Sequence, residues 1–363
     1  MTGDGPPGGP SPCPSCGQPV WPGDNFCEAC RAPAGLARQA AGQAAACRRC
    51  ASGRIGPDGY CESCGCKAPA ERDHIEAGLG PLAGMTDRGL RHVRNEDAMA
   101  LAATPEAAIA VVSDGVSDSS RPDQASLAAV RTALRVLLAA AQAGQDAVAG
   151  LSGRESMAEA SARAAASAQE AVSALSGARP GGTHSTRPAD APSATFASAV
   201  VTAGTVTVCW LGDSRAYWLD AGQPSAAKQL SRDDSLAAEM VSAGLLSEAE
   251  ATSAEAHVVT GWLGADTGQA APHVASFTPP GAGAVLVCTD GLWNYEPEAE
   301  KLAVRALPAA LRDPLGAARD LVDFALSAGG RDNVTVVLVP FPLAGSAGPA
   351  RTYPDDLKEM DDE

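Results

Sequence analysis

The chain has 363 residues, of which 45% are hydrophobic and 19% charged, which is enough for a large domain with its own core and a second, smaller domain. Its formal net charge of −16 argues against nucleic acid or an anionic membrane as the main partner. The first residues lack the basic and apolar regions of a signal peptide, and no run of 18 apolar residues follows. The sequence therefore predicts a cytoplasmic chain without a membrane-spanning helix.

Residues 1–12 are rich in glycine and proline, and we expect them to be disordered. The next segment, residues 13–66, contains four CxxC pairs, and the last two pairs repeat the first two at an offset of 34 residues, Cys47 against Cys13. The paired cysteines are Cys13, Cys16, Cys27, Cys30, Cys47, Cys50, Cys61 and Cys64.

Four thiolates in two CxxC pairs form the usual ligand set of a tetrahedral Zn²⁺ ion, which supplies folding free energy that so short a segment lacks. Disulfides fit poorly with a cytoplasmic chain, and redox motifs do not occur as four CxxC pairs in register. The sequence thus predicts two zinc ribbons with one structural zinc each. Cys66, just past the last pair, is either an alternative ligand or a bystander.

The predicted ribbons offer few basic residues and no row of aromatic side chains on which bases could stack. A protein partner is therefore favoured over nucleic acid for this segment. Residues 67–80 are expected to form a linker into a large domain at 81–341, and the acidic residues 342–363 a disordered tail.

The large domain begins with a segment in which cations precede anions. Arg91, His92 and Arg94 stand just before Glu96 and Asp97. Such a segment can be a solvated charged loop, or it can place a phosphate-binding cation beside a metal site; the segment alone leaves both interpretations open.

Three aspartates follow or precede short apolar runs that read as buried strands. Asp114-Gly115 ends the run Ile109–Ser113, Asp290 ends residues 284–289, and Asp332 precedes residues 334–339. One Asp-Gly at a strand end is usually a turn. Three strand-end carboxylates together with a Glu-Asp pair predict instead an oxygen-ligand site for Mg²⁺ or Mn²⁺.

Between these aspartates the pattern predicts helices at residues 124–142 and 143–172, a loop at 177–194, and strands at 196–202, 205–210 and 216–219. Asp213 lies between the last two strands, in a plain hairpin turn or in the site. A helix at 236–243 is expected to begin after Ser235 as N-cap, and another helix is expected at 315–328.

Five segments, in this order, resemble the metal-dependent protein serine/threonine phosphatases of type 2C, the PPM family. They are residues 86–89 with 95–97, 112–115, 211–215, 288–293 and 330–335. The resemblance implies an α+β fold, a four-layer α/β/β/α sandwich of two antiparallel sheets, here preceded by the small zinc ribbons. It also implies an enzyme that hydrolyses phosphoserine and phosphothreonine in the protein substrates of a serine/threonine kinase.

The same resemblance implies a binuclear Mn²⁺ or Mg²⁺ centre that activates a water molecule. Asp114 would bridge the two ions. The other residues carried over as metal ligands are Asp290 and Asp332 at one ion, Glu96 and the Gly115 carbonyl at the other, and Asp213 at a third, weaker one. Asp97 would lie nearby in support.

One departure from the family pattern concerns the cation that clamps the substrate phosphate. The family usually has arginine where this chain has His92, with Arg91 and Arg94 close by. An imidazole is cationic only near or below its ordinary pKa of about 6.5, and it cannot form the bidentate contact of a guanidinium.

The departure leaves two functional hypotheses. In the first, the chain is an active phosphatase whose ribbons select a protein partner. In the second, a weakly active or inactive type 2C domain binds phosphoproteins as a regulatory module, with the ribbons contributing to recruitment.

Overall fold

A computed structural model describes residues 11–12, 19–20, 50, 54–56, 60–65, 71–146, 156–177, 191–247, 258–266, 271–343 and 351–354. The chain divides into two compact units, Met1–Ala68 and Pro69–Glu363. In the first unit, strands β1 (Ser11–Pro12) and β2 (Pro19–Val20) pair antiparallel. Ser11 and Pro12 are thus ordered by a strand pairing within the segment expected to be disordered.

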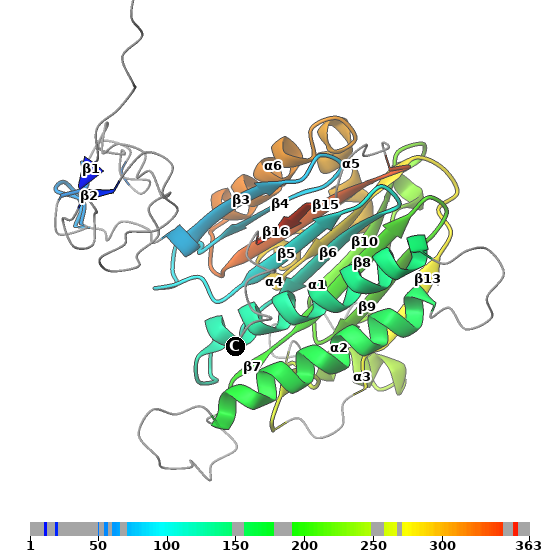
Figure 1. The fold of residues 1–363 in the computed structure, drawn as a ribbon, viewed down its shortest axis with the longest axis horizontal. Coiled ribbons are helices and arrows are strands. Elements are labelled where there is room, and N and C mark those ends of the chain that lie inside the picture. Colours follow the sequence, from blue (N-terminus) through cyan, green and yellow to red (C-terminus); the bar gives the residue numbers. More distant parts are fainter. Residues whose placement is uncertain are drawn as a thin grey trace, which may run out of the picture. The chain divides into compact units, whose positions relative to one another are not determined.

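The second unit contains two six-stranded antiparallel sheets within its described residues (Figure 1). The first has the order β11-β10-β14-β15-β4-β3 and the second the order β13-β9-β8-β6-β5-β16. In the first sheet the strands are β3 (His74–Gly78), β4 (Ala83–Asp87), β10 (Arg215–Asp220), β11 (Lys228–Gln229), β14 (Gly283–Cys288) and β15 (Val334–Phe341). In the second they are β5 (Ala98–Ala103), β6 (Ala107–Ser113), β8 (Phe196–Thr202), β9 (Val206–Leu211), β13 (His273–Phe277) and β16 (Arg351–Tyr353).

Helices cover the outer face of each sheet. Helices α1 (Pro122–Asp146) and α2 (Met157–Ala174) pack on the second sheet, and α5 (Ala299–Ala310) and α6 (Pro314–Ser327) on the first. A third cluster of buried side chains, including Val112, Val208 and Val287, fills the space between the sheets. The predicted α/β/β/α sandwich is confirmed.

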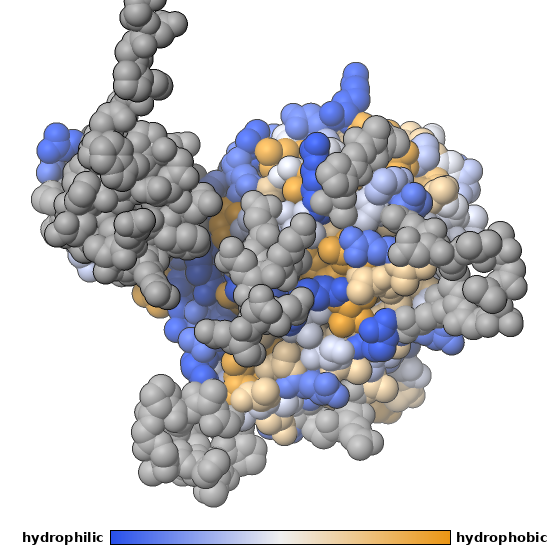
Figure 2. Space-filling model, in the orientation of Figure 1, coloured by the Kyte–Doolittle hydropathy of each residue, from blue (hydrophilic) through white to orange (hydrophobic). Residues whose placement is uncertain are grey.

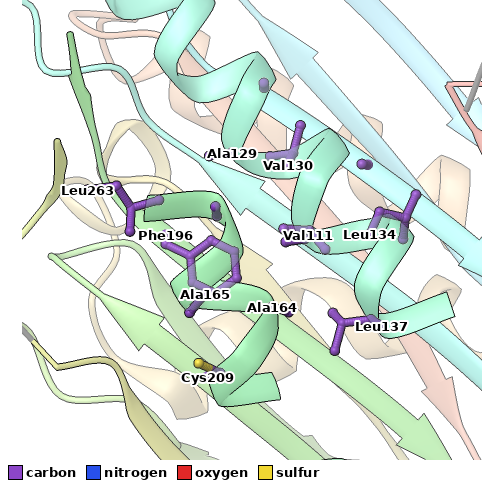
Figure 3. Packing of buried hydrophobic residues seen from close by; sticks show 14 of the residues in the cluster. Val111, Ala129, Val130, Leu134, Leu137, Ala164, Ala165, Phe196, Cys209 and Leu263 are labelled. Carbon is purple, nitrogen blue, oxygen red and sulfur yellow. The ribbon is translucent and has the colours of Figure 1, made fainter. Parts of the chain in front are cut away.

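Small side chains let the layers approach closely in a chain with only 4% aromatic residues. Between α1, α2 and the second sheet, Ala129, Ala164 and Leu134 are fully buried against Val111 and Phe196 (Figure 3). Alternation of alanine with larger residues therefore forms this layer of the core.

The helices predicted at 124–142 and 143–172 correspond to α1 and α2, with residues 147–155 between them outside the described part of the chain. The second begins where Ser156 forms a capping box: Glu159 N donates to Ser156 Oγ at 3.2 Å, and Ser156 N donates to the Glu159 carboxylate at 2.7 Å. By length and composition alone, α1 is the one helix among the described residues that could cross a membrane. Its Ala125, Ala129 and Leu134 are fully buried against the sheet and α2, as in the core helix of a globular domain.

Three sequence expectations need correction. The domain begins earlier than residue 81, because η1 (Glu71–Asp73) and β3 lie in the segment read as a linker. Strand β16 pairs with β5 inside the tail expected to be disordered. Helix α5 and strand β13 were not predicted at all, whereas α3 (Leu236–Ser242) begins as expected after Ser235, whose side chain accepts from Ala238 N.

The surface of the described residues is mixed in character. On the face shown in Figure 2, hydrophobic and hydrophilic residues are interspersed rather than gathered in one continuous area. On this face the described residues thus form no large continuous apolar surface.

Candidate metal centre

A cleft with a volume of about 510 Å³ opens where strands of both sheets end. Its lining includes four aspartates that the sequence places far apart: Asp114, Asp213, Asp290 and Asp332. The antiparallel register explains why they meet. Arg215 pairs with Cys288, and Cys288 pairs with Val336. One end of the first sheet therefore brings together the turn before β10, the end of β14 and the start of β15.

Asp114 follows β6 and is fixed through its backbone. Its N–H donates to Thr195 Oγ1 at 3.0 Å, and its carbonyl accepts from Thr195 N at 2.8 Å. The next residue must be glycine, because a Cβ on Gly115 would lie 2.5 Å from the Pro122 carbonyl oxygen and 2.8 Å from that of Glu96. The Asp-Gly sequence thus brings the carboxylate to the cleft through a tightly packed backbone.

Asp290 begins the short helix α4 (Asp290–Trp293) directly after β14 and Thr289. Its Oδ2 accepts from Asn294 Nδ2 at 2.9 Å. Its Oδ1 is buried and has no hydrogen-bond partner in the described part of the chain. An unpartnered, buried carboxylate oxygen is costly unless a cation balances it.

Asp97 is not among the residues that line the cleft, but its carboxyl group repeats this pattern. Its Oδ2 accepts from Thr289 Oγ1 at 2.8 Å and from Thr335 Oγ1 at 2.7 Å, whereas its Oδ1 is buried and lacks a hydrogen-bond partner in the same described set. The two threonine hydroxyls therefore hold the carboxyl group in one orientation and leave the other oxygen available for a ligand.

The electrostatics of the cluster favour a bound cation. Burial, together with the charges of the neighbouring aspartates, raises the pKa of Asp114 and of Asp290 well above the usual range. Burial also raises the pKa of Asp97 and of Asp213 to about 7. The raised pKa values mean that the negative charges of these four carboxyl groups, on Asp97, Asp114, Asp213 and Asp290, are costly without a cation. Together they form a set of oxygen donors suited to Mg²⁺ or Mn²⁺. The residues present therefore fit the metals that the sequence predicted.

Asp332 is the most exposed member, with 41% of its side chain accessible. His92 Nε2 lies 3.1 Å from Asp332 Oδ1, so the predicted phosphate-binding histidine contacts a predicted metal ligand. Arg91 is exposed beside it. Of these residues Asp332 lines the cleft, and His92 contacts it from outside the lining.

Glu96 has a different environment from the four aspartates. Its Oε1 accepts from Arg94 Nε at 2.8 Å and its Oε2 from Ser117 Oγ at 2.6 Å. Glu96 is not among the residues that line the cleft. Its predicted role as a metal ligand stays a prediction, and Arg94 is positioned by this contact rather than toward the aspartates.

One buried amide joins the parts of the site. Asn333, 2% exposed, accepts from Glu96 N at 2.7 Å through its Oδ1 and donates through Nδ2 to the carbonyl oxygens of Arg88 and Arg94. The segment 88–96 is thereby fastened to the start of β15. Asn333 belongs to the last of the five family-like segments, 330–335, but the sequence alone did not indicate this linking role.

Sequence reasoning also missed the residues that hold the aspartates in place. Thr289 and Thr335 orient Asp97, and each stands next to or near a predicted ligand, which is the one signal that could have identified them. Arg215 pairs with Asp233 through two contacts at 2.7 and 2.9 Å and lies 3.7 Å above the Trp293 ring, while Trp293 Nε1 donates to the Asp213 carbonyl. Arg215 and Trp293 therefore support the turn that carries Asp213.

In the N-terminal unit, three of the eight predicted zinc ligands are described. The sulfur atoms of Cys50, Cys61 and Cys64 all lie within 4.8 Å of one another. The remaining predicted ligands, Cys13, Cys16, Cys27, Cys30 and Cys47, lie outside the described residues.

The site agrees with comparisons to known proteins. A family model described as protein phosphatase 2C matches residues 88–313. The serine/threonine phosphatase stp of Listeria innocua is 31% identical over 148 residues, 40% of this chain and 55% of the relative. The chain thus spans about half the length of the curated relatives it matches.

Solved structures with the same fold cover more of the chain. The PPM Ser-Thr phosphatase MsPP from Mycobacterium smegmatis, in complex with cacodylate, has a TM-score of 0.52 at 27% identity and covers 72% of this chain and 99% of its own. Stp1 from Staphylococcus aureus has a TM-score of 0.57 at 19% identity, over 77% and 100%. The catalytic domain of the phosphatase PstP, in complex with two manganese ions, has a TM-score of 0.50 at 21% identity, over 75% and 97%.

Proposed function

The chain belongs to the protein phosphatase 2C family, and from this premise we propose that it hydrolyses phosphoserine and phosphothreonine in proteins, using two divalent Mn²⁺ or Mg²⁺ ions. The observation that carries the proposal is the convergence of Asp114, Asp213, Asp290 and Asp332 on one cleft. Structural carboxylates are normally paired with cations or donors, but Asp290 and the nearby Asp97 each retain a buried oxygen without a hydrogen-bond partner among the described residues.

In this proposal Asp114, Asp290, Asp332 and the Gly115 carbonyl, which all line the cleft, would hold the two ions. When bound, the ions lower the pKa of a water molecule and offset charge on the phosphoryl oxygens. Asp97, oriented by Thr289 and Thr335, faces this centre with its second oxygen. Asp213 serves a third, weaker ion.

The substrate phosphate would enter at the mouth of the cleft, where His92 contacts Asp332 and Arg91 is exposed. Arg94 is engaged by Glu96 and is therefore the less available cation. Glu96, whose two oxygens are held by Arg94 and Ser117, would reach an ion only through a rearrangement or a water molecule.

Turnover by the full chain tests the proposal. We would measure hydrolysis of p-nitrophenyl phosphate and of a phosphothreonine peptide with Mn²⁺, with Mg²⁺ and with EDTA, from acid to mildly alkaline pH. We expect turnover that requires the metal. Asp290→Asn should lower it beyond the roughly 100-fold loss that outer-sphere partners of a metal can cause. Asp320→Asn, which removes an exposed aspartate on α6, is the matched control and should leave turnover unchanged.

The second candidate is a phosphoprotein-binding module, favoured by the replacement of the family's arginine with His92. It predicts a different result in the same experiment: no turnover in any metal from folded protein, together with metal-dependent binding of the phosphopeptide. Turnover lost in EDTA would exclude it.

We further propose that the substrates are cytoplasmic phosphoproteins of a serine/threonine kinase and that the N-terminal unit contacts a protein partner. The net charge of −16 and the scarcity of basic residues in residues 13–66 support a protein rather than a nucleic-acid partner.

A further inference from the structure

The thiol cluster of the N-terminal unit takes no part in the phosphatase site, and its geometry is specific. The sulfur atoms of Cys50 and Cys61 are 3.7 Å apart, and Cys64 lies within 4.8 Å of both. Four sulfur atoms bound tetrahedrally at about 2.3 Å from a zinc ion stand about 3.8 Å from one another. The observed separation of Cys50 and Cys61 is therefore that of two ligands on one ion.

A disulfide does not explain these distances, because bonded sulfur atoms are about 2.05 Å apart. Burial in a hydrophobic core does not explain them either. Cys209 and Cys288 are that kind of cysteine: both are buried within strands, and burial raises the pKa of the Cys209 thiol to about 12. In the cluster, by contrast, Cys61 is 2% exposed whereas Cys64 is exposed.

The backbone around Cys61 forms a short hairpin, followed by a turn that contains Cys64. Ile55 pairs with Cys61, Gly56 N donates to the Tyr60 carbonyl at 2.7 Å, and Gly65 N donates to the Cys61 carbonyl at 2.8 Å. The last bond closes a turn that brings Cys64 back beside Cys61. Two cysteines presented by one tight turn form half of a tetrahedral thiolate site.

This hairpin has little core of its own. Among the described residues of the N-terminal unit whose burial is known, Cys61 is the buried hydrophobic residue, and the aromatic Tyr60 is 46% exposed. A segment of this size does not gain enough free energy from apolar burial to fold alone, and a bound metal commonly supplies the difference.

We propose that Cys50, Cys61 and Cys64 are thiolate ligands of a structural Zn²⁺ ion. Cys47 lies outside the described residues, and the sequence alone makes it the candidate for the fourth ligand. The position of Cys47, three residues before Cys50, repeats the spacing of Cys61 and Cys64. For the earlier repeat, Cys13 to Cys30, whose cysteines lie outside the described residues, a second zinc stays a prediction from the spacing. The ion is independent of the carboxylate centre because soft thiolates select Zn²⁺, whereas the aspartates suit Mg²⁺ or Mn²⁺.

Metal content of the full chain tests this proposal directly. We would purify the protein without chelator and measure zinc and iron per chain by mass spectrometry, and we expect two zinc ions and no iron. Cys61→Ser and, separately, the exposed Cys64→Ser should each lower the zinc content by half. Cys209→Ser, in strand β9 of the other unit, is the matched control and should keep both ions.

The fourth ligand is tested in the same way. Cys47→Ser should lower the zinc content by half and Cys66→Ser should not; the reverse result would overturn the assignment of Cys47. Zinc contents unaffected by both Cys61→Ser and Cys64→Ser, or iron in place of zinc, would overturn the site itself. Hydrolysis of p-nitrophenyl phosphate by each variant separates this outcome from a failure of the phosphatase proposal.

Discussion

The carboxylates of the cleft and the thiols of the N-terminal unit are both sets of cation-binding groups, but they are built in opposite ways. Asp114, Asp290 and Asp332 extend from strands whose residues are almost entirely buried, so a large core holds them whether or not a cation is present. Cys61 and Cys64 extend from a hairpin with almost no core.

The difference shows what each metal does for its surroundings. In the cleft, the fold brings mutually repelling carboxylates together, and a cation relieves that repulsion. In the hairpin, the proposed zinc ion would contribute the free energy that makes the fold possible. The first arrangement suits chemistry on a substrate, and the second suits a rigid contact surface.

The largest effect should come from damage to the scaffold of the carboxylate site. A Cβ on Gly291 would overlap the backbone of Asn333, which cannot move without displacing β15. We expect Gly291→Ala to lower the free energy of unfolding by about 3 kcal/mol or more. Urea unfolding measures this, with Gly204→Ala as the control, since a Cβ there has open space around it. Equal effects of the two variants would contradict the close packing of this motif.

The next effect separates the two scaffolds. A strong zinc chelator should unfold the N-terminal unit and leave the melting temperature of the phosphatase unit unchanged. Limited proteolysis should then show rapid cleavage within residues 13–66 and a stable fragment from about residue 71. Joint unfolding of both units, or continued protection of residues 13–66 from the protease, would contradict the claim that zinc stabilises the N-terminal unit alone.

A smaller effect concerns the pH dependence of stability in metal-free protein. Burial raises the pKa of Asp97 and Asp213 to about 7, so the folded state binds more protons than the unfolded state between about pH 4 and 7. These two groups therefore contribute stability at low pH that is lost as pH rises through about 7. After EDTA treatment, the melting temperature should fall from about pH 5 to pH 7.5, and Mn²⁺ should raise it more at the higher pH.

Replacing Asp97 with asparagine supplies the control, since the variant should lose part of this pH slope. A melting temperature that rises over the same range in EDTA would show that the cluster is not the dominant titrating element.

The smallest effect is expected at the mouth of the cleft. His92→Arg should lower KM for a phosphopeptide by about ten-fold at mildly alkaline pH, because arginine stays charged and can bind phosphate through two donors. The comparison is repeated at about pH 6. Steady-state kinetics at both pH values measure this difference. An unchanged KM at both would exclude His92 from phosphate binding.

Much of this organisation was predictable from the sequence because it is local. Asp114 and Asp290 each follow an apolar run and precede glycine. The strand and the carboxylate at its end can therefore be predicted together from one short stretch of sequence. The sandwich and its ligand order came from the resemblance of five such segments to a known family. Helix α1 and the N-cap at Ser235 followed from periodicity and local hydrogen-bonding chemistry.

The remainder depends on contacts between distant segments. Strand β16 lies in an acidic tail and is ordered through pairing with β5, which no local pattern indicates. The hydroxyls of Thr289 and Thr335 meet Asp97 only because the sheet register aligns them. The engagement of Glu96 by Arg94 and Ser117 likewise depends on the fold of the loop. The order of a single sequence does not reveal such pairings.

The position of β15 has a consequence for the synthesis of the protein on the ribosome. In chain order this strand comes after the other strands of its sheet, yet it lies inside that sheet between β14 and β4, and Asn333 just before it binds the backbone of Arg88, Arg94 and Glu96. A nascent chain can complete neither the sheet nor the metal site until residues up to about 341 have left the exit tunnel. The proposed phosphatase activity would therefore be withheld from chains that end before this strand.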